Sequence, residues 1–221
     1  MVFGCRVLQD IGEAQVGKSA AIRKDRPGST PSRLTKTHWI DAAREVLVRS
    51  GVNRIKVQLL AVSLETTTGS FYWHFKDRNA LLDALLDDWE VRAMTPFTNA
   101  LERAGADPFG QLEAIAKVWI SADEFEPAYD SAMREWSRTS AAVERRLRRV
   151  DGQRIALLQQ IFRGLGFDES RAFIRARIVY FHQIGYYSLR IKESVEQRTE
   201  LMPLYNEVFT ACAPIRKTAE T

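Results

Sequence analysis

The chain has 221 residues, of which 45% are hydrophobic and 27% are charged, a balance typical of a folded protein and not of a disordered one. Its most apolar stretch, residues 178–191, is interrupted by polar residues such as His182 and Arg190. It is therefore too polar for a membrane span, which needs roughly 18 apolar residues. No secretory or lipoprotein signal is visible, and Cys5 and Cys212 alone form no disulfide framework. We expect a cytoplasmic protein that does not enter a membrane.

Positive charge is concentrated in the N-terminal third of the chain. The formal net charge is +4, but residues 23–78 contain eleven Lys and Arg against five Asp and Glu, whereas residues 79–221 contain nineteen against twenty-one. An excess of positive charge in one segment is typical of proteins that bind a polyanion. A solvated basic surface without a partner would give the same count, so charge alone leaves both interpretations open.

Residues 1–33 predict a flexible basic tail. They mix Gly, Ser, Pro and scattered charges without helical or strand periodicity, and Pro-Gly-Ser-Thr-Pro at residues 27–31 ends the stretch as a linker would. We place a small helical domain at residues 34–78 and a larger helical domain at residues 79–221.

The small domain begins with a helix that Thr35 can cap and that ends near Gly51. Its apolar face is formed by residues at helical spacing: Ile40, Ala43 and Leu47. A second short apolar helix is predicted over residues 57–64. These two helices supply one layer of a small core.

A third short helix follows after a gap that has room only for a tight turn. Glu65 and Thr66 separate it from the second helix, Thr67 is a plausible N-cap, and the helix is predicted to run through Phe75. Two short helices joined by a tight turn form a helix-turn-helix.

The rest of the chain is also predicted to be helical. Asp77 can cap a fourth helix with a broad apolar stripe, which plausibly joins the two domains. Further helical patterns cover residues 108–121, 127–138, 141–165, 169–192 and 195–212. Pro108 and Pro127 suit first-turn positions, and no alternating pattern of a strand is visible. The predicted fold class is all-α.

Residues 64–82 read LETTTGSFYWHFKDRNALL. Small polar residues that open a helix, then Tyr-x-His-Phe, a Lys, a helix cap and a pair of leucines resemble the DNA-binding domain of the TetR (tetracycline repressor) family. The resemblance covers about a quarter of the chain, from Thr35 to Leu86. It implies a homodimeric transcription regulator with an N-terminal helix-turn-helix domain and a C-terminal domain that binds a small-molecule effector and dimerises.

The aromatic residues of this stretch divide between core and surface. Phe71 and Phe75 are four residues apart, so they share one helix face and can anchor the third helix. Five successive aromatic residues cannot all point inward on one helix, so Tyr72 and Trp73 must be partly exposed. By resemblance, the residues that reach base edges are Thr68, Gly69, Trp73 and His74. Those that hold the DNA backbone are Thr67, Ser70, Tyr72 and Lys76.

Two residues depart from the family pattern in the turn. Glu65 stands where the family usually has a glycine, and Thr66 stands where it usually has an aliphatic residue. If the turn requires a positive φ at Glu65, the fold stores on the order of 1 kcal/mol of backbone strain there.

The larger domain offers candidates for an effector pocket and a dimer interface. Pocket candidates are large residues on helices that surround a bundle core: Trp119, Met133, Trp136, Phe162, Tyr180 and His182. Ordinary packing is the better explanation for any single one of them. Glu124, Glu126 and Asp130 suggest a cationic effector or a solvated acidic face. The last two helices, which the family resemblance makes the dimer-forming pair, carry an apolar stripe: Ile174, Ile178, Phe181, Ile184, Leu204, Val208 and Phe209.

No sequence motif indicates catalysis, a metal site or a cofactor. The three histidines, His38, His74 and His182, are far apart and lack Cys or carboxylate neighbours at ligand spacing. The expected partner is double-stranded DNA with a pseudo-palindromic operator, bound by a repressor that a small molecule releases. Alternatives are an activator or effector-independent regulator of the same fold, and a helical interaction protein that has lost DNA binding.

Overall fold

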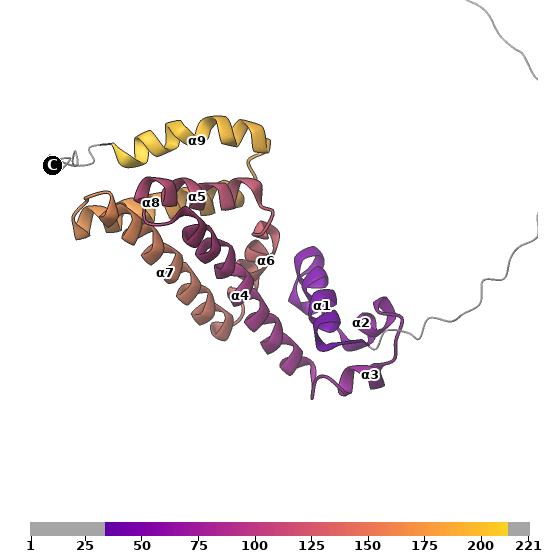
Figure 1. Cartoon of the computed structure of the whole chain (residues 1–221). Helices are drawn as coiled ribbons and strands as arrows, with labels where there is room; N and C mark the ends of the chain where they lie inside the picture. Colours follow the sequence, from indigo (N-terminus) through magenta and orange to yellow (C-terminus); the bar gives the residue numbers. More distant parts are fainter. Residues whose placement is uncertain (1–33, 212–221) are drawn as a thin grey trace, which may run out of the picture. The chain divides into compact units, whose positions relative to one another are not determined.

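The computed structural model describes residues 34–211, so the predicted tail at residues 1–33 and both cysteines lie outside the described residues. Over residues 34–211 the chain forms nine α-helices and one short 3-10 helix, without a strand (Figure 1). The all-α prediction is confirmed. None of these helices is both long and apolar enough to cross a membrane.

The elements follow the predicted order, and their bounds are α1 Lys36–Ser50, η1 Val52–Arg54, α2 Val57–Ser63, α3 Thr68–Tyr72, α4 Arg78–Ala104, α5 Pro108–Ser121, α6 Pro127–Ser137, α7 Ala141–Gly164, α8 Glu169–Ser188 and α9 Val195–Thr210. Side-chain caps fix several starts, because Thr67, Asp77 and Asp107 each accept hydrogen bonds from amides of the following turn. α3 is shorter than predicted, since it ends at Tyr72 and not at Phe75.

Helix α8 also ends earlier than its apolar pattern predicts. Arg190 has φ +53°, and the amide of Ile191 donates a hydrogen bond to the carbonyl of Tyr186 at 3.3 Å. This arrangement is a Schellman motif, in which one left-handed residue turns the chain and the last carbonyls of the helix are satisfied. The helix therefore stops at Ser188, although the residues that follow continue the apolar pattern.

The helix-turn-helix does not have a hydrophobic core of its own. Side chains of α1–α3 form one continuous buried cluster with the first part of α4, with α6 and with the start of α7. Its members include Trp39, Leu47, Leu60, Phe71, Leu81, Leu85, Trp89, Tyr129, Met133 and Val143. Residues 34–211 accordingly lie in a single compact unit. The division at residue 78 stays a prediction.

A second buried cluster lies among the later helices. It draws on the end of α4 and on α5, α7 and α8, with members that include Phe97, Leu112, Ile115, Trp119, Leu158, Phe162, Ala176 and Tyr180. Helix α4 thus contributes to both clusters, up to Ala93 in the first and from Phe97 onward in the second. Pro96 lies inside α4 between these two contributions.

Buried charges connect α4 to α6, α7 and α8. The guanidinium of Arg154, 2% exposed, donates to a carboxylate oxygen of Asp130 at 3.1 Å and to the carbonyl of Ala93 at 2.9 Å. The hydroxyl of Tyr180 donates to Asp151 at 2.6 Å. A buried charge needs such partners, because leaving it unpaired in a medium of low polarity costs several kcal/mol.

Candidate DNA-binding surface and ligand cavity

Aromatic packing holds the third helix of the helix-turn-helix in place. Phe71 is fully buried, and its ring contacts that of Trp39 edge to face at 5.3 Å and stacks on that of Phe75 at 5.4 Å between centroids. The ammonium of Lys36 lies 5.3 Å from the Phe75 ring centroid. The burial of both phenylalanines agrees with their predicted anchoring role. The sequence did not predict that Trp39 would be buried beside them, because the apolar spacing in α1 indicated Ile40 as the core residue.

A second anchor was not apparent from the sequence. Arg78, the first residue of α4, donates from Nε to the carbonyl of Ile55 at 2.6 Å and from Nη2 to the carbonyl of Val52 at 2.7 Å. These bonds join the end of the helix-turn-helix to the loop before α2. A charged donor to two carbonyls fixes position more strongly than a neutral one, so Arg78 is a positioning residue for α3.

The residues predicted to contact DNA all lie on α3 or next to its ends. Six are exposed, namely Thr67, Thr68, Gly69, Tyr72, Trp73 and Lys76, and two are half-buried, namely Ser70 and His74. Trp73 is 84% exposed and Tyr72 is 61% exposed. Large aromatic side chains are usually well buried, so this exposure indicates a surface that meets a partner.

The turn between α2 and α3 is a second Schellman motif. Glu65 has φ +52°, its amide donates to the carbonyl of Val62 at 3.1 Å, and the amide of Thr66 donates to the carbonyl of Ala61 at 2.9 Å. The positive φ considered from the sequence is therefore present. A residue with a Cβ in this region carries about 1 kcal/mol of strain, which glycine would not.

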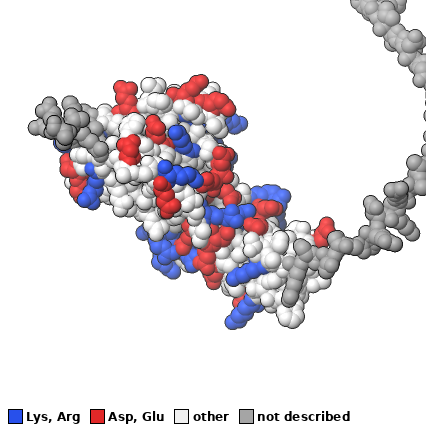
Figure 2. Space-filling view, in the orientation of Figure 1, with Lys and Arg blue, Asp and Glu red and all other residues white. Residues whose placement is uncertain are grey.

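Exposed basic side chains of α1–α3 and of the segments that join them lack acidic partners. Figure 2 shows the end formed by α1–α3 as mostly uncharged with separate Lys and Arg side chains, whereas acidic and basic side chains lie close together over the rest of this face. Among residues 34–211, five exposed cations of this end have no carboxylate within 4.0 Å: Lys36, Arg49, Arg54, Lys56 and Lys76. Unpaired surface cations are available to phosphates.

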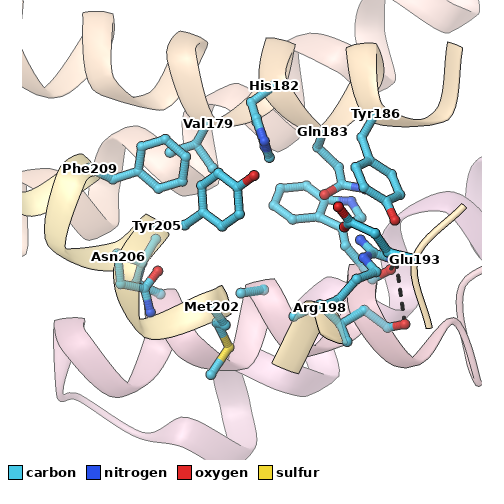
Figure 3. A pocket seen from close by; sticks show the side chains of 14 residues that line it. Val179, His182, Gln183, Tyr186, Glu193, Arg198, Met202, Tyr205, Asn206 and Phe209 are labelled. Carbon is cyan, nitrogen blue, oxygen red and sulfur yellow. Dashed lines mark hydrogen bonds between the residues drawn. The ribbon is translucent and has the colours of Figure 1, made fainter. Parts of the chain in front are cut away.

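A cavity of about 60 Å³ lies between α5, α8 and α9 (Figure 3). Its wall includes buried apolar side chains from all three helices, among them Leu112, Trp119, Val179 and Met202. Its polar lining residues are His182, Gln183, Tyr186, Glu193, Arg198, Tyr205 and Asn206. An apolar wall with a few polar groups is the usual character of a small-molecule site.

Two of the six predicted pocket residues, Trp119 and His182, line this cavity. The others pack elsewhere, Met133 and Trp136 in the first buried cluster and Phe162 and Tyr180 in the second. Helical periodicity shows which side chains point inward, but it does not show where neighbouring helices leave a space between them. More of the lining could have been predicted from the polar residues within α9, one of which, Asn206, is buried.

The predicted dimer-interface residues fall into two groups. Ile174, Ile178, Phe181, Leu204 and Val208 are exposed, by 50% to 68%. Ile184 and Phe209 are half-buried and pack against the second cluster of the same chain, and Phe209 also lines the cavity. Only the first group is available to a second subunit.

The acidic residues considered for a cationic effector are paired with arginines of the same chain. Glu124 pairs with Arg103, Glu126 with Arg44 and Arg92, and Asp130 with Arg154 and Arg134. These carboxylates therefore serve contacts between helices. Over residues 34–211 no three His, Cys, Asp or Glu side chains are grouped as metal ligands.

Sequence comparison identifies the N-terminal helices. The family described as bacterial regulatory proteins, tetR family, matches residues 40–85, which contain α2, α3 and parts of α1 and α4. The tetracycline repressor protein class D of Escherichia coli is 41% identical over 54 residues, which are 24% of this chain and 25% of that protein. The sequence match thus spans about a quarter of that curated relative.

Structural comparison covers more of the chain. The reduced form of Escherichia coli NemR aligns with a TM-score of 0.65 and 16% identity over 81% of this chain and 98% of that chain. A TetR-family transcriptional regulator from Marinobacter aquaeolei aligns with a TM-score of 0.57 and 16% identity, over 79% and 90% of the two chains. At such low identity these matches show the fold alone. The helix-turn-helix region of this chain thus matches the TetR family of bacterial regulatory proteins, and the described residues share the all-helical fold of these solved structures.

Proposed function

We propose that this protein is a dimeric transcriptional repressor that binds a pseudo-palindromic operator through α3 and is released from it by a small molecule. The observation that carries the proposal is the surface of α3. It presents Trp73, 84% exposed, on a helix that Phe71 anchors from the other side. A major groove admits an α-helix, and side chains exposed in this way can reach base edges.

The exposed residues of α3 and of the segment directly after it divide by chemistry into two groups. Trp73 can contact a thymine methyl group, and Thr68 can hydrogen-bond to a base edge. Tyr72 and Lys76 carry a hydroxyl and a free ammonium, which suit phosphate oxygens. Gly69 would accept a Cβ at ordinary contact distance, 3.5 Å from the Thr67 hydroxyl, so the chain itself does not require glycine there. Close approach of DNA would require a small residue at this position.

The second subunit is proposed to pack on α8 and α9. Four large apolar side chains of α8 are 40% to 52% exposed, Phe173, Ile174, Ile178 and Phe181, and two of α9 are 58% and 68% exposed, Leu204 and Val208. Several exposed large apolar side chains on one helix are typical of an interface. A twofold-symmetric dimer would place two copies of α3 in successive major grooves, about 34 Å apart.

The proposal is tested with the DNA that lies directly upstream of the protein's own gene. Fluorescence anisotropy would compare a labelled duplex of that region with a shuffled duplex of the same composition, at several salt concentrations. We expect the natural duplex to bind at least about a thousandfold more tightly at moderate salt. Equal affinities would contradict operator recognition and would favour a helical interaction protein that has lost DNA binding.

A further inference from the structure

We propose that the cavity between α5, α8 and α9 binds a small monocarboxylate, whose carboxylate pairs with Arg198 and whose apolar body packs against Leu112 and Trp119. The inference rests on the proposed function, because it names the chemical class of the small molecule that would act on this regulator. Three features of the lining support it: the charge of Arg198, two buried amides and the apolar wall (Figure 3).

Arg198 is a half-buried cation without an acidic partner. Its Nη1 donates to the carbonyl of Trp119 at 2.9 Å and to that of Ile120 at 3.5 Å, and its guanidinium carbon lies 4.3 Å from the ring centroid of Tyr186. These carbonyls belong to the last turn of α5, where helical partners are missing. No carboxylate lies within 4.0 Å of Arg198 among residues 34–211. The guanidinium is thus held in place while its charge is left for a ligand.

Two buried amide groups in the lining lack acceptors. Gln183 and Asn206 are 6% and 3% exposed, and neither Nε2 of Gln183 nor Nδ2 of Asn206 has an acceptor within 3.5 Å in the described part of the chain, although the Gln183 side chain is near enough to Tyr187 to act on the pKa of its hydroxyl. Buried donors are nearly always paired in folded proteins. Both unpaired atoms are donors, as is the guanidinium, so the ligand that suits them carries acceptor oxygens.

The wall of the cavity limits the rest of the ligand. Leu112, Trp119, Val179 and Met202 are at most 9% exposed, and the free volume is about 60 Å³. That space admits a short aliphatic chain or part of one ring, with the remainder extending toward the opening. Burial and the nearby Arg198 lower the pKa of His182, which favours its neutral form. Arg198 is the only Lys or Arg among the described lining residues.

Glu193 is the one lining group that opposes an anionic ligand. It is exposed on the segment between α8 and α9, so water screens its charge, whereas Arg198 is half-buried. A cationic ligand would have to use Glu193 together with the aromatic rings of Tyr186 and Tyr205. The two possibilities make opposite predictions for substitutions at Glu193 and Arg198.

Isothermal titration calorimetry on the full chain, without DNA, distinguishes these ligand classes. Benzoate and hexanoate are the probes, with benzamide, hexanamide and benzylamine as neutral and cationic controls of similar shape. We expect both carboxylates to bind, each amide to bind at least about tenfold more weakly, and benzylamine not to bind. Arg198→Gln should weaken carboxylate binding at least about tenfold, whereas Glu193→Gln, which removes the opposing charge, should tighten it.

Two further variants keep the test decisive if Arg198→Gln disturbs folding. Ala116→Phe fills the cavity without removing a polar group and should abolish binding. Lys192→Gln removes an exposed cation that does not line the cavity and should bind carboxylates normally. Benzylamine binding that Glu193→Gln abolishes, or no carboxylate binding at millimolar concentration, would overturn the proposal.

Operator binding is measured separately, so the two failures remain distinguishable. A chain that recognises its operator but binds no carboxylate contradicts only the ligand class. A chain that binds benzoate through Arg198 but treats operator and shuffled DNA alike contradicts the proposed function and leaves the cavity assignment intact.

Discussion

The surface of α3 and the cavity between α5, α8 and α9 differ in how far apart their residues lie in the sequence. The eight proposed DNA-contacting residues lie within ten consecutive positions, from Thr67 to Lys76, whereas the cavity lining extends from Leu112 to Phe209. The geometry of one helix decides what α3 exposes. The cavity depends instead on how three helices pack. A recognition surface can therefore be predicted from a motif, but a cavity cannot.

The largest expected effect is on assembly, which depends on the distant helices. Replacing both Ile178 and Phe181 by Arg should convert a dimer into monomers, because each side chain is about half exposed and would bring an unpaired charge into the interface. Sedimentation equilibrium measures the mass directly. Val91→Arg, at a 64% exposed position on α4, is the matched control and should leave the dimer intact.

The choice of positions matters for this test. Ile184 and Phe209 pack against the core of their own chain, so Arg at those positions would confound folding with assembly. If the variant with Arg at 178 and 181 remains a dimer, the interface lies elsewhere on the surface.

The next largest effect concerns the buried charges that join α4 to α6, α7 and α8. Asp130→Asn should lower the free energy of unfolding by about 3 to 5 kcal/mol, because it leaves the buried guanidinium of Arg154 without its carboxylate. Glu135→Gln on the same helix breaks a pair with Arg138 that is 76% to 77% exposed, so it should change stability by less than about 1 kcal/mol. Urea denaturation compares the two variants, and similar losses would contradict the importance of burial.

A smaller effect separates base contacts from phosphate contacts on α3. Trp73→Ala should cost about 1 to 3 kcal/mol per half-site on the operator and much less on random DNA. Lys76→Ala should weaken binding to both DNAs and reduce the salt dependence by about one unit per half-site. Val62→Ala, at a 75% exposed position on α2, controls for the loss of an exposed apolar side chain.

Binding of these variants to operator and shuffled duplexes at several salt concentrations decides the matter. If Trp73→Ala and Lys76→Ala lose affinity equally on both duplexes, the division of α3 into residues that contact bases and residues that contact phosphates is wrong.

The smallest effect concerns the left-handed residues that end helices. Glu65→Gly and Arg190→Gly should each raise the free energy of unfolding by about 0.5 to 1 kcal/mol, because both residues have φ near +50° and glycine adopts this conformation without strain. Gly166, at φ +94°, ends α7 in the same way, and Gly166→Ala should be destabilising. Thermal unfolding would measure all three. No gain at either Glu65 or Arg190 would show that these turns store no strain.

Local rules predicted most of the fold. Capping residues such as Thr67, Asp77 and Asp107 mark where helices begin, because their side chains accept hydrogen bonds from backbone amides that the helix leaves free. The residue at which α8 ends could not be predicted in this way. Its turn is made by Arg190, a residue type that seldom adopts positive φ, so no glycine marked the stop.

The candidate sites show the same limit. Tyr180 suited a pocket as an aromatic residue on an inward face, but its hydroxyl donates to Asp151, which lies 29 positions away in the sequence. Arg198 shows the converse, since nothing in the sequence around it indicates that it would contact the last turn of α5, 79 positions earlier. Such contacts follow from tertiary packing, and single-sequence periodicity carries no information about them.

The core that the helix-turn-helix shares with later helices determines where the chain can be truncated without loss of folding. A fragment ending at residue 78 would lack much of the cluster that α1–α3 help to form, because that cluster also contains α4 up to Ala93 and side chains of α6 and α7 such as Tyr129. Such a fragment should not melt as a cooperative unit. For anyone who wishes to exchange DNA specificities between regulators, the graft must therefore carry α4 through Ala93 and preserve the surfaces of α6 and α7 that close over it.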